Sequence, residues 1–227
     1  MQIKSNAQNK IRYGIGVDQF QTKLNNVDRK TFSGYGHSNP GFKQNNLLGF
    51  GINGIIKIPI YKSMGLQTGL GLTRYATQFH FQYYHSFSQQ WMDKRFSIGI
   101  NYANVPLNIY YDIKLTNKSS IIVFGGMNIK LLLWINDNFN DIIFEKINLP
   151  NIRQRYESVV YNYNSGVSYK YRFNRHNALE IGINFGRDVN PMVNNKPKHP
   201  ENFGFYANLH EATYSQYGLF LNYFFNH

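Results

Sequence analysis

The sequence contains no cysteine, little charge and no long apolar run, and each absence excludes a class of protein. Without cysteine the chain has no disulfides, no thiolate metal ligands and no thiol nucleophile. Charged residues make up only 16% of the 227 residues and aromatic residues 17%, which is not the composition of a disordered chain. No run approaches the roughly 20 apolar residues of a membrane-spanning helix. The start of the chain is polar and lacks the apolar segment of a secretory signal, so an exported protein would have had its signal removed.

The formal net charge of +12 comes from basic residues that are scattered along the chain. Nucleic-acid-binding proteins usually concentrate Lys and Arg in a patch or along one helix, so we do not expect a nucleic-acid partner. Anionic lipids and the phosphates of lipopolysaccharide are partners that fit such a surplus.

Apolar and polar residues alternate with a period of two from end to end, which is typical of β-strands with two different faces. The fourth strand changes phase near Pro106, and a change of one residue predicts a β-bulge there. Eight such segments are present, at 11–18, 49–60, 66–73, 96–113, 121–133, 159–173, 179–186 and 217–225.

The connections between these segments alternate in length. Short turns are expected at 61–65, 116–119 and 174–177, and long polar loops at 24–44, 85–94, 136–155 and 188–212. An up-and-down meander places all long loops at one rim and both chain ends at the other. The sequence therefore predicts one domain over residues 1–227, an eight-stranded antiparallel up-and-down barrel with a periplasmic N-terminal tail at 1–10.

The side-chain pattern favours a transmembrane barrel over a soluble one. The bulky residues of eight strands would overfill a narrow lumen, whereas Gly, Asn, Ser and Thr on the other face fit inside it. Aromatic residues also gather near both ends of the strands, as at membrane interfaces. Those expected at the short-turn rim are Tyr61, Tyr110, Tyr111, Tyr171, Phe173, Phe224 and Phe225. Those expected at the long-loop rim are Phe79, Phe81, Tyr83, Tyr84, Trp91 and Trp134. A soluble, lipocalin-like barrel that binds a small apolar ligand remains the alternative.

Two segments resemble known outer-membrane sequences. Residues 216–223 resemble the C-terminal insertion signal of bacterial outer-membrane barrels, which has a polar residue, a glycine, an apolar residue and an aromatic at fixed spacing. Residues 102–111, read as YANVPLNIYY, resemble a strand of the Bacteroidota outer-membrane barrel family that includes PorT, with Asn104 where the family has Glu. This resemblance implies an outer-membrane barrel and, by analogy, a link to protein secretion or gliding machinery. The residues assigned to the insertion signal are Gln216, Gly218, Leu221, Tyr223 and Phe225.

Several charged residues share the parity that is predicted to face the lumen. A buried charge needs a partner, so we expect Glu180 to pair with Arg172 or Lys170 across the last short hairpin. Because a small barrel leaves no aqueous channel, a structural plug is the favoured interpretation, with a proton or ion path as the alternative. The predicted ion network comprises Lys57, Asp112, Lys130, Lys170, Arg172 and Glu180.

Apolar residues in the long loops predict a contact surface for another outer-membrane or periplasmic protein. No catalytic motif is visible, and the histidines lack the spacing of a metal site, so the sequence favours a non-enzymatic scaffold or accessory subunit with no cofactor and no metal. A lipid A-modifying enzyme is the alternative, since small barrels can carry a triad assembled from separate loops. The residues expected to face a partner are Trp91, Phe139, Ile142, Ile143, Phe144, Phe203, Phe205 and Tyr206.

Overall fold

A computed structural model describes residues 11–25, 43–85, 90–137, 156–174, 176–191 and 213–225, and all regular structure in these ranges is β-strand. This described part of the chain holds no helix with the length and apolar character needed to span a membrane. The strands are β1 (Arg12–Asn25), β2 (Lys43–Asn46), β3 (Leu48–Tyr61), β4 (Met64–His85), β5 (Gln90–Lys114), β6 (Ser119–Asp137), β7 (Val159–Arg172), β8 (Ala178–Asp188) and β9 (Thr213–Phe225).

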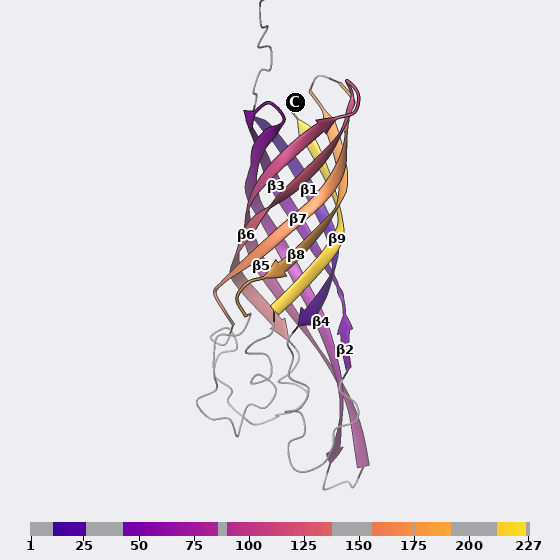
Figure 1. Ribbon diagram of the computed structural model, residues 1–227. Coiled ribbons are helices and arrows are strands. Elements are labelled where there is room, and N and C mark those ends of the chain that lie inside the picture. The colour runs from indigo at the N-terminus through magenta and orange to yellow at the C-terminus, as the bar shows by residue number, and fades with distance from the viewer. Residues whose placement is uncertain are drawn as a thin grey trace, which may run out of the picture.

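The strands form one closed antiparallel barrel (Figure 1). From β3 to β9 each strand pairs with the next in sequence, and β1 closes the ring by pairing with both β3 and β9. The four-residue β2 pairs with β4 beyond the end of β3, so the ring itself has eight strands. The first residue of β1 and the last of β9 lie at the rim of the short turns. The predicted fold is confirmed, and the first barrel strand begins and the last one ends at the predicted rim.

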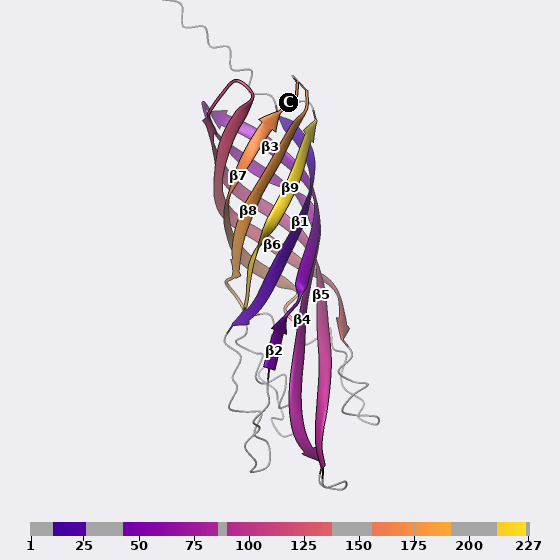
Figure 2. The ribbon, with the colours of Figure 1, turned by 90° about the vertical axis from the view of Figure 1, so that its right-hand side faces the viewer.

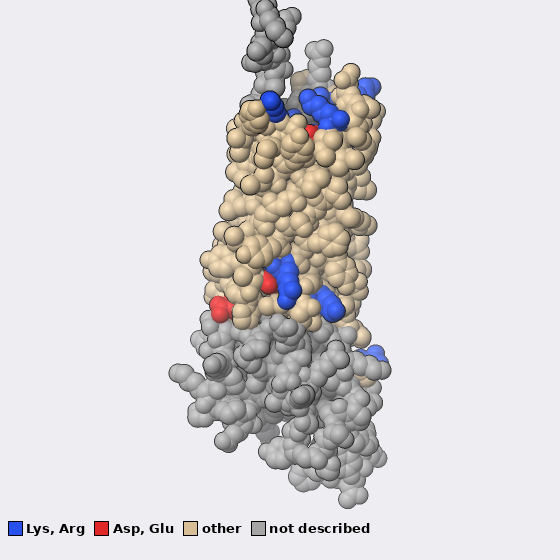
Figure 3. All heavy atoms as spheres, viewed as in Figure 1, with Lys and Arg blue, Asp and Glu red and all other residues tan. Residues whose placement is uncertain are grey.

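The outer wall of the barrel is apolar. Ile15, Leu70 and Leu219 expose 59%, 65% and 61% of their surface, although they lie in the middle of strands. The face in Figure 3 shows a band free of Lys, Arg, Asp and Glu, with charged side chains above and below it. Strand β8 has 11 residues and, at the tilt usual in barrels, spans about 25 Å along the membrane normal. This length matches the height of the apolar band of membrane barrels. The predicted orientation is therefore confirmed, and the soluble alternative is wrong.

The aromatic residues near the rims divide between the two faces of the wall. Tyr61, Phe173 and Trp134 point outward and are about half exposed, as residues at a membrane interface should be. Tyr110 and Phe224 were also expected at the interface, but they are 3% and 1% exposed and lie in the lumen. They occupy the even-numbered, inward-facing positions of strands β5 and β9.

The predicted second long loop is mostly strand. Residues 85–94 were expected to connect two barrel strands, but β4 and β5 pair as far as His85 and Gln90. Their hairpin extends well beyond the other strands (Figure 2). Trp91, predicted to lie in a loop, is in β5 and pairs with Tyr84 of β4. The prediction missed these strands because ladder hydrogen bonds join backbone groups and do not need the strict apolar alternation of the lipid-facing wall.

The predicted β-bulge beside Pro106 is not where the sequence placed it. Even-numbered residues face inward along β5, both before and after Pro106, as Ile98, Ile100 and Asn108 show. The register irregularity lies opposite Asn101 and Tyr102, and the extra residue belongs to β6. The change of phase in the sequence instead marks a change in what fills the lumen, from apolar side chains to amides.

Candidate functional site in the barrel lumen

The lumen of the barrel is filled by side chains in successive layers. A polar chamber occupies the middle, and a layer of buried apolar and aromatic residues lies on each side of it. A second, larger cavity opens at the rim of the short turns, which we call the mouth. Each layer follows from the inward parity of the strands, because every second residue must fit inside a ring of eight strands.

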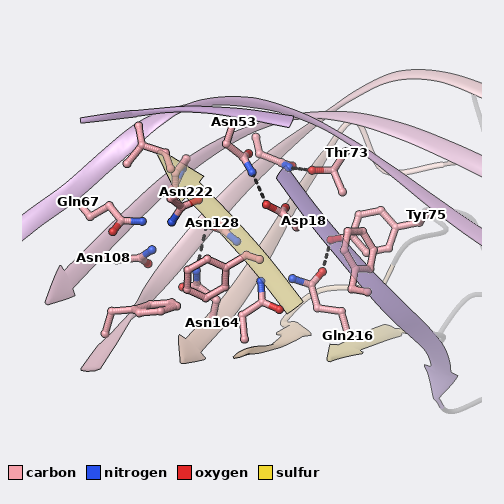
Figure 4. Close-up of a pocket in the computed structure, with 17 residues that line it drawn as sticks. Asp18, Asn53, Gln67, Thr73, Tyr75, Asn108, Asn128, Asn164, Gln216 and Asn222 are labelled. Atoms are coloured by element: carbon pink, nitrogen blue, oxygen red, sulfur yellow. Dashed lines mark hydrogen bonds between the residues drawn. The ribbon is translucent and has the colours of Figure 1, made fainter. Parts of the chain in front are cut away.

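The middle chamber is lined mainly by amides, as Figure 4 shows. Its volume is about 80 Å³, enough for a few water molecules in a polar site. Asp18 accepts a hydrogen bond from Asn53 at 2.7 Å, and Asn164 donates to Asn128 at 3.4 Å. The polar residues that line the chamber are Asp18, Asn53, Gln67, Thr73, Asn104, Asn108, Asn128, Asn164, Asn184, Gln216 and Asn222.

On the side of the long connections, aromatic rings seal the chamber. Tyr75 lies at the centre, with ring centroids 5.1 Å from Phe20, 5.7 Å from Tyr102 and 5.4 Å from Tyr214. All four rings are at most 2% exposed. The hydroxyl of Tyr75 donates to the side-chain oxygen of Gln216, so the ring layer is also tied to the chamber wall.

A buried ion pair lies next to these rings. Lys130 Nζ is 2.7 Å from Asp188 Oδ1 and 4.3 Å from the centroid of Tyr75. Asp188 also accepts hydrogen bonds from the Asn162 side chain at 2.9 Å and from the Tyr214 backbone N–H at 3.2 Å. The carboxylate is therefore compensated by a cation and two further donors, as a buried charge requires.

On the side of the short turns, a second pair crosses the lumen. Lys57 Nζ of β3 is 2.5 Å from Glu180 Oε2 of β8, and Ser168 donates to the other oxygen of Glu180 at 2.8 Å. Two clusters of buried apolar residues surround this pair. One comprises Tyr110, Ile122, Phe124 and Phe220, and the other comprises Ile55, Ala178 and Phe224.

The predicted pairing of Glu180 with Arg172 or Lys170 is wrong. Lys170 does lie opposite Glu180 in the β7–β8 ladder, and Arg172 lies opposite Ala178. Lys170 nevertheless forms its ion pair with Asp112 of β5, because strands that are not neighbours meet across a narrow lumen. The prediction considered one hairpin alone and could not include Lys57.

The mouth is larger than the middle chamber, with a volume of about 480 Å³. Three inward-facing cations, Arg12, Lys170 and Arg172, line it together with Asp112. Arg12 lies 3.8 Å from Asp112, the same carboxylate that pairs with Lys170. The rim adds the exposed Lys62 and Lys118 of two turns and the exposed Lys114 at the end of β5. Lys62 has a φ of 44°, the left-handed conformation that a two-residue hairpin turn requires.

The residues of the predicted insertion signal occupy both faces of β9. Gln216 and Gly218 face the lumen, whereas Leu221, Tyr223 and Phe225 are about 40% exposed on the outer wall. A side chain at position 218 would collide with the backbone of Gln19 and Phe20, which explains the glycine. Their role in insertion stays a prediction.

Seven predicted partner-facing residues lie outside the described residues, namely Phe139, Ile142, Ile143, Phe144, Phe203, Phe205 and Tyr206. Three lumen charges were missed: Arg12, Asp18 and Asp188. Asp188 shares the even parity of Glu180 on β8, so the alternation carried the signal that could have found it. Within the described ranges no group of three or more His, Asp or Glu residues is placed to hold a metal ion.

Comparisons with known proteins give structural likenesses only. No protein-family model matches the chain, and no curated protein matches it. The outer membrane protein OprG from Pseudomonas aeruginosa is 12% identical, with 96% of this chain and 95% of that chain covered and a TM-score of 0.44. The outer membrane protease OmpT from Escherichia coli is 10% identical, with 96% of each chain covered and a TM-score of 0.43.

A third solved structure is the attachment invasion locus protein Ail of Yersinia pestis, crystallised with the heparin analogue sucrose octasulfate. It is 9% identical, with 95% of this chain and 99% of that chain covered and a TM-score of 0.37. At these identities and scores the likenesses transfer no activity, ligand or partner to this chain.

Proposed function

We propose that this chain is an integral outer-membrane protein that conducts no solute and serves as a scaffold or accessory subunit of an outer-membrane complex. The observation that carries the proposal is the filled lumen. The aromatic layer around Tyr75, the apolar layer that includes Phe220 and two buried ion pairs lie between the mouth and the opposite rim. A barrel that offers no path through its centre acts through its rims or its outer wall.

The proposed orientation places the chain ends and the short turns in the periplasm and the long connections outside the cell. This is the usual arrangement of bacterial outer-membrane barrels. The long β4–β5 hairpin would then extend from the cell surface, within reach of lipopolysaccharide or of a partner protein. Outer-membrane lipids and lipopolysaccharide are the proposed lipid partners.

Planar-bilayer recording tests the filled lumen. The refolded chain should insert without giving stable conductance steps. The double variant Tyr75→Ala/Phe220→Ala, which thins both apolar layers, is the matched control and should show brief openings. A stable open pore in the unaltered protein would contradict the proposal.

Purification of the tagged chain from native membranes in mild detergent tests the subunit role. We expect a stoichiometric outer-membrane or periplasmic protein to co-purify, and deletion of residues 81–94 should reduce its recovery. The resemblance of residues 102–111 to the PorT-containing family favours a component of secretion or gliding machinery. A chain that always purifies alone would count against the subunit role.

The proposal includes no catalysis and no cofactor. The alternative of a lipid A-modifying enzyme makes a distinct prediction, which mass spectrometry of lipid A can check. A strain that lacks the gene should have the lipid A of its parent. A changed acylation pattern, restored by the wild-type gene, would favour the enzyme.

A further inference from the structure

The mouth of the barrel has the chemistry of an anion-binding site. Six cationic side chains line it, and Asp112 is the one acidic residue among the described residues that do so, which leaves an excess of five positive charges. We propose that the mouth binds a small soluble anion that carries two or more phosphate groups.

The arrangement of the cations favours a compact ligand that enters the lumen. Arg12, Lys170 and Arg172 occupy inward positions on two strands, and the Arg12 and Lys170 side chains are 20% and 5% exposed. Arg12 and Lys170 share Asp112, so the internal carboxylate neutralises one of the three positive charges. A ligand phosphate can replace or supplement Asp112, because guanidinium groups bind phosphate oxygens in pairs.

The shape of the cavity distinguishes this ligand from a lipid headgroup. Its volume of about 480 Å³ is within the range of small-molecule sites. The ladders of β5–β6 and β7–β8 run unbroken to the rim, so the barrel wall separates Lys170 and Asp112 from the surrounding bilayer. A ligand therefore reaches these groups from the aqueous side. The exposed Lys62, Lys114 and Lys118 at the rim would raise its local concentration.

Titration calorimetry of the refolded full chain in zwitterionic micelles tests the site, with sodium triphosphate, pyrophosphate and monophosphate as probes. We expect saturable one-to-one binding that is tightest for triphosphate and weakens as salt is added. Arg172→Gln should weaken binding about tenfold, since it removes a charged donor. Asp112→Asn should strengthen binding, because the competing carboxylate is gone.

Arg187→Gln is the matched control, since Arg187 is an exposed cation at the opposite end of β8. It should leave the affinity for triphosphate unchanged. Heat-dependent mobility on gels shows whether each variant is folded, and Lys118→Gln in an exposed turn serves if Arg172→Gln does not fold. Absence of saturable binding, or equal weakening by Arg187→Gln, would overturn the proposal.

The source of the phosphate is tested by moving the protein into lipid nanodiscs. Triphosphate should bind with the same stoichiometry in phosphatidylcholine discs and in discs with added phosphatidylglycerol. If phosphatidylglycerol removes triphosphate binding at constant ionic strength, the mouth is a headgroup site and the proposal is wrong.

Discussion

The charged residues at the two ends of the lumen differ in how far they are buried and in how completely they are neutralised. At the long-connection end, Lys130 and Asp188 are about 1% and 3% exposed, and two further donors complete the coordination of the carboxylate. At the mouth, Arg12 and Lys170 share Asp112, and Arg172 lines the same cavity of about 480 Å³. A charge that is sealed from water must be neutralised by the protein, whereas a charge that water reaches can stay uncompensated and available.

The largest expected effect comes from breaking the sealed pair. Asp188→Asn leaves Lys130 buried beside Tyr75 without its counter-charge, and should destabilise the barrel by about 3–5 kcal/mol. Urea unfolding in lipid vesicles, followed by tryptophan fluorescence, measures the change. Asp112→Asn at the mouth is the paired comparison and should cost less, about 1–2 kcal/mol, because Asp112 and Lys170, although only 10% and 5% exposed, line a cavity that water can fill. Equal losses at both ends would remove the distinction.

The buried pair of Lys57 and Glu180 allows two explanations to be separated. Either the ion pair stabilises the barrel relative to an apolar replacement, or each charge is needed only because the other is present. Lys57→Met should destabilise by about 3 kcal/mol, because Glu180 keeps its charge in an apolar layer. The double variant Lys57→Met/Glu180→Leu should recover most of this loss, since a buried pair can often be replaced by apolar groups of similar volume. Urea midpoints of the two single variants and the double variant complete the cycle. A double variant as unstable as the sum of the single variants would show no coupling between the two side chains and would contradict their mutual dependence.

The outer wall provides a third environment, where no counter-charge and no water is present. Ile183→Arg in the middle of β8 should cost about 2–4 kcal/mol in vesicles, as charged residues do at the bilayer midplane. Val189→Arg, just beyond the end of β8 and 50% exposed, should cost about 1 kcal/mol or less. Vesicle-bound unfolding titrations compare the two. Similar costs at both positions would place the apolar band elsewhere on the wall.

The alternation of the sequence was enough to predict which side of the wall meets lipid. This property is local, because consecutive residues of a strand point to opposite faces and a strand needs no knowledge of its distant partners. It correctly assigned Ile15, Leu70 and Leu219 to the outside, together with the closed ring and the rim at which the first barrel strand begins and the last one ends. It failed for Ile98 and Ile100, since apolar residues also fill the lumen near the aromatic layer.

The contents of the lumen were harder to predict because they depend on the whole ring. Parity identified Lys57, Lys130 and Glu180 as lumen residues, but the partner of each lies on a strand that is not its neighbour. Which strands face each other depends on the stagger of the closed barrel, and that follows from all eight registers together. The mouth was missed for the same reason: its cations come from four separate parts of the sequence.

The smallest expected effect concerns the link between the aromatic layer and the chamber. Tyr75→Phe removes the hydroxyl that donates to Gln216 but keeps the ring contacts with Phe20 and Tyr102, so it should cost about 1 kcal/mol. Tyr111→Phe, with its ring 49% exposed on the outer wall, is the control and should change the urea midpoint very little. If Tyr75→Phe proved neutral, the Gln216 oxygen would be satisfied by chamber water, and the aromatic layer would act through packing alone.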